Sequence, residues 1–193
     1  MIIKNHELEY IEDGHIYLVD GVVVPSITQL LKVKFSNKYD HVDKATLERA
    51  SEAGTKVHEV IEAWCRNGED SDLKELRNFK VLQRLYKFQV LENEIPVILF
   101  MDNEPVSAGR LDMLITLNGE IGLADIKRTS ALDKEYLFYQ LNLYRIAYQQ
   151  CYGTEIKFLR GIHLREDRRK FVPIPINEEM AMELAKEALN ELR

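Results

Sequence analysis

Residues 109–127, GRLDMLITLNGEIGLADIK, decide the fold of this chain. Two apolar runs are joined here by Asn118 and Gly119. This dipeptide favours a two-residue hairpin turn because it tolerates positive φ at both central positions. The segment therefore predicts a tight antiparallel hairpin with the turn at its centre.

The predicted hairpin brings two carboxylates together. Counting outward from the turn places Asp112 directly opposite Asp125. Directly opposed like charges repel each other, so a purely structural sheet should avoid this pair, whereas two converging carboxylates suit a hard cation such as Mg²⁺. Side chains alternate along a strand, so Lys127 lies on the same face as Asp125 while Ile126 points away. Unless a bulge shifts the register, the hairpin presents two acids and one amine together.

The remaining patterns predict an α/β (α+β) chain built as one domain. The 193 residues are 46% hydrophobic and 30% charged, which is enough for one sizeable core. We expect residues 1–35 to form a small N-terminal β-meander and a short helix capped by Ser26, as a lobe beside a core of residues 44–193. Within the core we expect helices over 44–66, 70–94, 133–152 and 177–192, and further strands over 97–101, 155–164 and 170–174.

The net charge of −6 argues against non-specific binding of nucleic acid by the whole surface, but it allows a channel with a local positive lining. The candidate basic residues for such a lining are Lys80, Arg84, Lys87, Arg110, Lys127, Arg128, Arg165, Arg168, Arg169 and Lys170. Each of them is equally compatible with a solvated face. The chain shows no secretory or transmembrane segment, so we expect a cytoplasmic protein without a membrane partner.

The acids and the lysine of the hairpin form a known pattern. Asp112 followed by residues 125–127 (DIK) resembles the core motif of the PD-(D/E)XK nuclease superfamily, with Leu111 in place of the proline of the family name. A triplet of this kind is common, and residues 72–74 and 155–157 have the same form. In neither of these does a tight hairpin place an acid opposite the triplet, so the pairing carries the resemblance.

Two helical segments extend the resemblance to one branch of the superfamily. Residues 54–58 (GTKVH) are similar to the first motif of RecB-like nucleases and phage-type exonucleases, in which His58 would bind the metal from a helix. Glu62 lies one turn further along the same face and is carried over as an additional candidate. Gln140 and Tyr144 resemble the final motif, in which both side chains reach the active site or the DNA.

The resemblance implies a restriction-endonuclease-like core, whose mixed central sheet contains an antiparallel three-stranded meander and is flanked by helices. It implies a metal-dependent DNA exonuclease of phage-type recombination or DNA processing, in a bacterial or phage-infected cell. The implied ligands of Mg²⁺ or Mn²⁺ are His58, Asp112, Asp125 and the backbone carbonyl of Ile126. The implied catalytic residues are Asp112, Asp125, Lys127, Gln140 and Tyr144, and the expected substrate contacts are Arg110, Arg128 and Thr129. The iron-sulfur sub-class needs four cysteines, and this chain has only Cys65 and Cys151.

Phage enzymes of this kind form rings on DNA and work beside a single-strand annealing protein, so the resemblance implies a homo-oligomer and such a partner. Three alternatives remain: a structure-specific, resolvase-like endonuclease of the same superfamily, a DNA-binding module that has lost catalysis, and a structural α/β domain whose opposed aspartates are an accident of the assumed register. The intact set of Asp112, Asp125 and Lys127 favours an enzyme.

Overall fold

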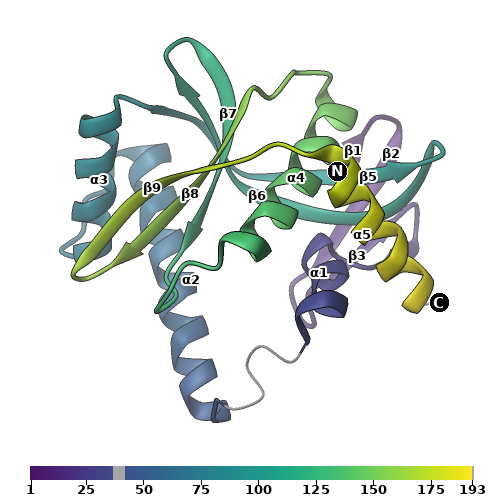
Figure 1. Ribbon diagram of the computed structural model, residues 1–193, viewed down its shortest axis with the longest axis horizontal. Helices are drawn as coiled ribbons and strands as arrows, with labels where there is room; N and C mark the ends of the chain where they lie inside the picture. The colour runs from purple at the N-terminus through teal and green to yellow at the C-terminus, as the bar shows by residue number, and fades with distance from the viewer. Residues whose placement is uncertain (37–41, 193) are drawn as a thin grey trace.

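The computed structural model describes residues 1–36 and 42–192. Two sheets and the helices that cover them make up this part of the chain (Figure 1). The elements are β1 (Ile2–Ile3), β2 (His6–Ile11), β3 (Ile16–Val19), β4 (Val22–Val24), α1 (Ile27–Phe35), α2 (Lys44–Asn67), α3 (Lys74–Tyr86), β5 (Gln89–Met101), β6 (Glu104–Leu117), β7 (Glu120–Lys127), α4 (Lys134–Tyr152), β8 (Phe158–Arg165), β9 (Arg168–Ile174) and α5 (Glu178–Glu191).

The N-terminal meander forms as predicted, with the two-residue β1 as an additional strand. Its four strands are antiparallel in the order β1-β2-β3-β4. The inner face packs Leu8, Val19 and Val24 against the larger sheet at Ile98 and Ala108. Ser26 then begins α1 with the predicted capping box.

The larger sheet has five strands in the order β5-β6-β7-β8-β9. Neighbours are antiparallel except for the parallel pair β7 and β8, so the first three strands are the predicted meander inside a mixed sheet. Because parallel neighbours need a crossover, α4 connects β7 to β8. This arrangement confirms a mixed α+β architecture.

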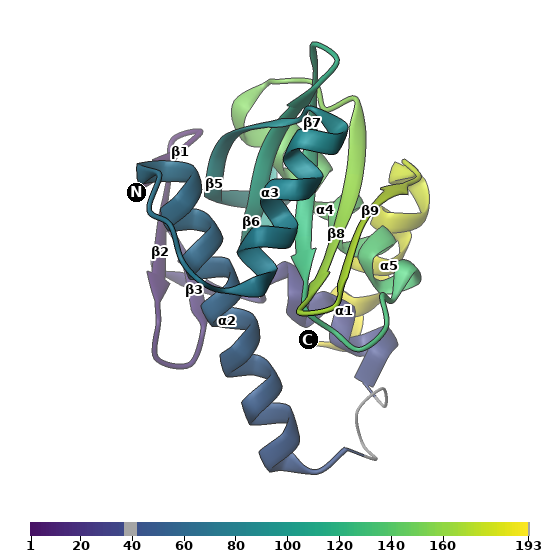
Figure 2. The same cartoon turned by 90° about the vertical axis from the view of Figure 1, so that its left-hand side faces the viewer.

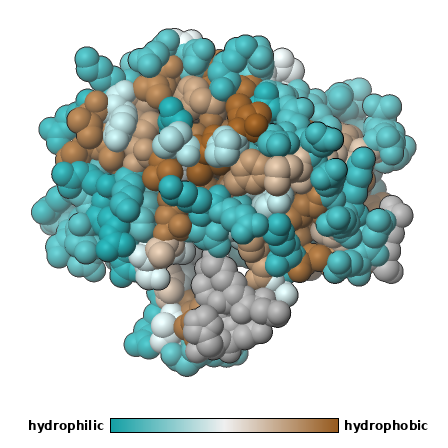
Figure 3. All heavy atoms as spheres, in the orientation of Figure 1, coloured by the Kyte–Doolittle hydropathy of each residue, from teal (hydrophilic) through white to brown (hydrophobic). Residues whose placement is uncertain are grey.

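Helices cover both faces of the five-stranded sheet. One hydrophobic cluster packs α1, α4 and α5 on one face, and a second packs α2 and α3 on the other. Figure 2 shows α2 and α3 on the near side of the strands, with α5 beyond them. On the face shown in Figure 3, hydrophobic residues gather over the middle of the molecule and hydrophilic residues lie around them. Within the described ranges, no helix combines the length and the apolar character needed to cross a membrane.

The predicted helix over residues 70–94 is wrong at its carboxyl end. The helix α3 ends at Tyr86, and Lys87 follows in the left-handed conformation with a φ of 58°. The chain then enters β5, which pairs with β6 as far as a two-residue turn at Asp102 and Asn103. Tertiary pairing decides this segment, because five of the residues 89–95 gain partners in β6 that an isolated helix end would not have.

Candidate metal centre

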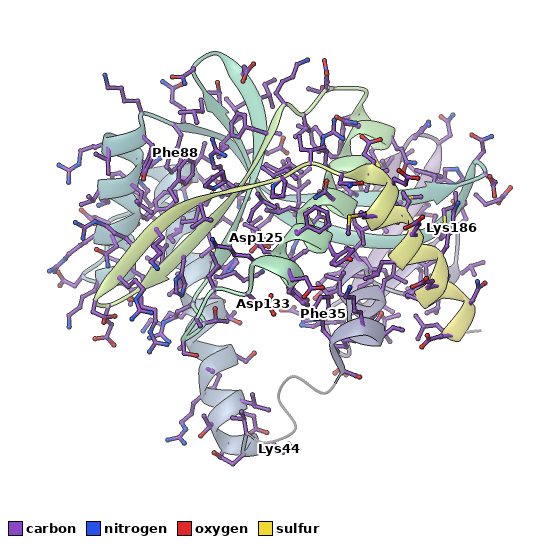
Figure 4. The ribbon with its side chains drawn as sticks, viewed as in Figure 1. Phe35, Lys44, Phe88, Asp125, Asp133 and Lys186 are labelled. Atoms are coloured by element: carbon purple, nitrogen blue, oxygen red, sulfur yellow. The ribbon has the colours of Figure 1, made fainter. Side chains whose placement is uncertain are left out.

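The predicted hairpin is confirmed at its turn. Leu117 pairs with Glu120 beside the turn, and the predicted register continues away from the turn as far as the pair of Met113 and Ala124. Asn118 and Gly119 both have positive φ, at 54° and 83°. Figure 4 shows Asp125, a residue of β7, near the centre of the molecule.

The strands part at Asp112, where the sequence predicted a direct pair with Asp125. The regular ladder ends one pair earlier, at Met113 and Ala124. Leu111 packs on the α4 side of the sheet and Met113 on the α2 side, so side-chain alternation is interrupted at Asp112. In place of a ladder bond, the carboxylate of Asp112 accepts a hydrogen bond from the backbone N–H of Ile126 at 2.7 Å. The irregularity keeps Asp112 beside β7 but turns its side chain across the strand end.

Asp125 and Lys127 lie on one face, as alternation predicted. The ammonium nitrogen of Lys127 is 2.6 Å from Asp125 Oδ2. Asp125 is only 1% exposed, and neither of its oxygens accepts a hydrogen bond of normal geometry from the described residues. Burial, followed by the charge of Asp112, raises the pKa of Asp125 to about 6 although Lys127 opposes the shift. For Lys127, burial is outweighed by the charges of Asp125 and Asp112, which raise its pKa above the usual value.

His58 reaches this centre from α2. Its Nε2 lies 3.2 Å from the carbonyl oxygen of Ile126. A carbonyl only accepts hydrogen bonds, so Nε2–H is the donor and Nδ1 of the neutral ring keeps its lone pair. Nδ1 lies 3.6 Å from Asp112 Oδ2 and 4.0 Å from Glu94 Oε1. The imidazole therefore presents a ligand nitrogen toward two carboxylates.

Glu94 is a candidate ligand that the sequence analysis missed. It lies in β5 with a φ of 54°, between the pairs Asn93–Met113 and Ile95–Leu111, and so faces Asp112 across the strands. One ligand atom each from His58, Glu94 and Asp112 lie within 4.8 Å of one another. Burial and the charge of Asp112 raise the pKa of Glu94. Assignment of the segment to a helix hid this residue.

The donor set fits a hard divalent cation. Two carboxylates and one imidazole nitrogen converge, and the buried Asp125 lies beside them with poorly satisfied oxygens. Carboxylate-rich sites of this kind suit Mg²⁺ or Mn²⁺, and a hydrogen bond from the other ring nitrogen is the usual way to orient a ligating histidine. The Ile126 carbonyl already accepts a hydrogen bond from His58 Nε2–H and has a second lone pair for a ligand role.

The two predicted residues of α4 are both buried. Gln140 is 5% exposed, and its side-chain oxygen accepts no hydrogen bond from the described part of the chain. The ring of Tyr144 lies so close to Gly109 that a Cβ there would be 3.0 Å from Tyr144 Cε1. Burial raises the pKa of Tyr144 well above its usual value, with Asp112 and Asp125 contributing, so its hydroxyl stays protonated beside the acids.

The expected substrate contacts separate into different environments. Arg110 belongs to the centre, since its Nε lies 2.6 Å from Glu94 Oε2. Arg128 instead pairs at 2.7 Å with the buried Glu75 of α3. Thr129 donates its hydroxyl hydrogen bond to the backbone of Ala131 at 2.7 Å. Glu62 pairs with Arg66 at 2.6 Å and lies outside the ligand cluster.

Comparison with known proteins gives a distant structural likeness. No family model and no curated protein matches the sequence. Among solved structures, the crystal structure of SSO0001 is similar to this chain with a TM-score of 0.49 and 15% identity, over 88% of this chain and 77% of that one.

Proposed function

We propose that this protein is a metal-dependent deoxyribonuclease that hydrolyses phosphodiester bonds as an exonuclease. The observation that carries the proposal is the convergence of His58, Glu94 and Asp112 beside the buried ion pair of Asp125 and Lys127. This cluster does not stabilise the fold through its acids, because carboxylates placed so close together repel one another. They are suited to holding a cation next to a phosphate.

In this proposal His58, Glu94 and Asp112 hold Mg²⁺ or Mn²⁺, with Asp125 and the Ile126 carbonyl as further ligands. The bound cation would supply Lewis acidity toward the scissile phosphate and lower the pKa of a bound water. Lys127 orients the attacking water or stabilises the charge that develops on the phosphate, a positioning and electrostatic role. The ammonium group is already held beside the ligands by its 2.6 Å contact with Asp125.

The backbone of Ile126 ties the ligands to one another. Its N–H donates to Asp112 and its carbonyl accepts from His58. Both side chains are therefore oriented by the backbone of the one residue that separates Asp125 from Lys127. Preorganisation of this kind reduces the reorganisation needed at the moment of reaction.

The choice of DNA and of exonuclease action rests on the resemblance to RecB-like and phage-type enzymes. The mixed sheet with helices on both faces and the order of the motifs along the chain support a restriction-endonuclease-like core. The same resemblance supports a homo-oligomeric ring and a single-strand annealing protein as partner. Cleavage of closed circular DNA would favour the structure-specific endonuclease instead.

The decisive experiment digests end-labelled linear duplex and covalently closed circular DNA with Mg²⁺, with Mn²⁺ and with chelator. We expect metal-dependent loss of the linear DNA alone and a fall of at least about 10²-fold in Lys127→Ala, since a lost charge-stabilising donor has an effect of this size. Lys157→Ala is the matched control because its exposed ammonium pairs with Glu155 away from the centre. Equal activity in both variants, or no cleavage by the parent, would reject the proposal.

Glu94 provides a test of the ligand set that does not depend on cleavage. We expect Glu94→Gln to weaken Mn²⁺ binding by about 10- to 100-fold in calorimetric titration, and to reduce the rise in melting temperature that Mn²⁺ gives the parent. The control is Glu92→Gln, an exposed acid two residues away on the same strand. Unchanged Mn²⁺ affinity in Glu94→Gln would remove Glu94 from the ligand set.

A further inference from the structure

The N-terminal meander carries an aromatic cluster that the proposed chemistry does not use. Tyr10 and Tyr17 pair across β2 and β3, with ring centroids 4.9 Å apart. The ring of His15 stacks on Tyr10 at 5.9 Å with an interplanar angle of 27°. The Tyr10 hydroxyl lies 2.6 Å from His15 Nδ1, which fixes the ring. The three rings thus form one ordered surface.

Arg110 connects this cluster to the candidate metal centre. Its guanidinium carbon lies 5.4 Å from the centroid of the Tyr10 ring, while its Nε lies 2.6 Å from Glu94. Glu94 in turn belongs to the ligand cluster with His58 and Asp112. One arginine side chain therefore separates the Tyr10 ring from the place where a phosphate would bind.

The pair remains accessible at the surface. Tyr10 is 36% exposed and the side chain of Arg110 is 48% exposed, whereas Leu8, on the same face of β2, is buried against the larger sheet. Along the inner face of β2, Leu8 is thus buried in the core, whereas Tyr10 is exposed beside the candidate metal centre. Packing of the lobe is provided by Leu8, Val19 and Val24, so Tyr10 is available for another role.

We propose that Tyr10 and Arg110 form a subsite for the nucleotide next to the scissile phosphate, in which the Tyr10 ring stacks on an unpaired base and Arg110 contacts a neighbouring phosphate. The subsite rests on the proposed nuclease function and adds to it a preference for an unpaired base at the centre. Aromatic rings that stack on bases, combined with arginines on the backbone, are the general means of holding single strands. Arg110 exchanges the carboxylate of Glu94 for a phosphate when the strand binds.

The test measures binding of a fluorescein-labelled single-stranded 12-mer in Mg²⁺ by anisotropy, in a Lys127→Ala background so that the probe is not consumed. We expect Tyr10→Ala to weaken binding by about 5- to 100-fold, the range for loss of one base–aromatic stack, and Tyr10→Phe to retain the affinity. The control is Ile11→Ala, since Ile11 is the next residue on the opposite face of β2 and is 45% exposed. Melting temperatures without DNA check that each variant is folded.

A set of 12-mers with one abasic position each makes the test specific for stacking. In the protein that retains Tyr10, one abasic position should weaken binding as much as the Tyr10→Ala substitution does. In the Tyr10→Ala variant, an abasic site at that position should cause no further loss of affinity. Arg110→Gln should instead lower the slope of log affinity against log salt by about 0.7, the value for one phosphate contact on a single strand.

The outcomes separate the subsite from the nuclease proposal. Unchanged affinity in Tyr10→Ala, or an abasic penalty that is equal in both proteins, overturns the subsite even when the parent cleaves DNA. A parent that neither cleaves nor binds DNA overturns the nuclease proposal and the subsite with it. The subsite is supported when one abasic position and the Tyr10→Ala substitution each weaken DNA binding to the same extent and their effects do not add.

Discussion

Two consecutive residues at the end of β7 make ion pairs on opposite faces of the sheet. Lys127 lies 2.6 Å from Asp125, and Arg128 lies 2.7 Å from Glu75. Both acids are 1% exposed. Arg128 Nε donates a hydrogen bond to Glu75 Oε1, whereas neither oxygen of Asp125 accepts one of normal geometry from the described residues.

The pair of Arg128 and Glu75 stabilises the fold, whereas the pair of Lys127 and Asp125 leaves a carboxylate that can still bind a ligand. Glu75 joins α3 to the end of β7 through a satisfied contact with Arg128. Asp125 instead lies near a second carboxylate, Asp112, and its pKa is raised to about 6 by burial and by that charge. A buried group left in this state is typical of functional sites, where the missing partner is a substrate or a cation.

The largest expected effect comes from breaking the pair of Arg128 and Glu75. Glu75→Ala should lower the free energy of unfolding by about 3–5 kcal/mol, because it leaves a mostly buried guanidinium without its partner. Urea unfolding measures this change. Glu166→Ala is the control, since Glu166 lies 4.0 Å from the same arginine but is 61% exposed, and it should cost less than about 1 kcal/mol. Equal small losses in both variants would contradict the structural role.

The substitution Asp125→Asn should raise the free energy of unfolding, whereas Glu75→Ala lowers it. In chelator at pH 8 we expect this variant to be more stable than the parent by about 1–3 kcal/mol, since each unit of pKa shift corresponds to about 1.4 kcal/mol. The pKa of Asp125 is raised from 3.8 to about 6 on folding, so ionisation destabilises the folded state. The parent therefore loses stability as the pH rises between about 4 and 6, and the advantage of the variant should vanish near pH 4.

Unfolding curves across this pH range check the prediction. Saturating Mn²⁺ should reverse the order by stabilising the parent more than Asp125→Asn. A variant that is less stable than the parent at pH 8 in chelator would show that the contact with Lys127 outweighs burial and the repulsion from Asp112.

The smallest expected effect concerns the packing beside the acids. Gly109→Ala should destabilise the protein by about 1 kcal/mol and reduce DNA cleavage, because its Cβ would lie 3.0 Å from Tyr144 Cε1 and would displace the ring. Gly54→Ala in α2 is the control: nothing lies within 4 Å of its Cβ, so helix propensity should stabilise it by about 0.5–1 kcal/mol. Thermal unfolding and the cleavage assay measure both variants.

The sequence predicted those parts of the site that local chemistry determines. The turn at Asn118 and Gly119 set the register of the hairpin, and alternation placed Asp125 and Lys127 on one face. The motif resemblance identified His58, which the structure brings within 3.6 Å of Asp112. Each of these inferences needed only neighbouring residues or a pattern along one helix.

The parts that were missed depend on contacts between distant segments. Glu94 was hidden because the residues before it favour a helix. Regular pairing from the turn at Asp102 and Asn103 would also place it across from Leu111, and only the register shift between Leu99 and Phe100 brings it opposite Asp112. The partner of Arg128 lies 53 residues away, and no local pattern indicates it. The interruption of alternation at Asp112 likewise arises from packing on both faces of the sheet.

The 14-residue β6 is shared by two hairpins with two-residue turns, and this has a consequence for the order of folding. Glu94, Asp112 and Asp125 all lie within the continuous segment Gln89–Lys127, so local strand pairing alone can collect them. Hairpins form within about 1–10 μs, whereas docking of His58 requires closure of a longer loop. We therefore expect the segment that carries the three carboxylates to form its hairpins before α2 docks and brings the imidazole of His58 to them. Detachment of α2 would remove the nitrogen ligand and leave the acids assembled.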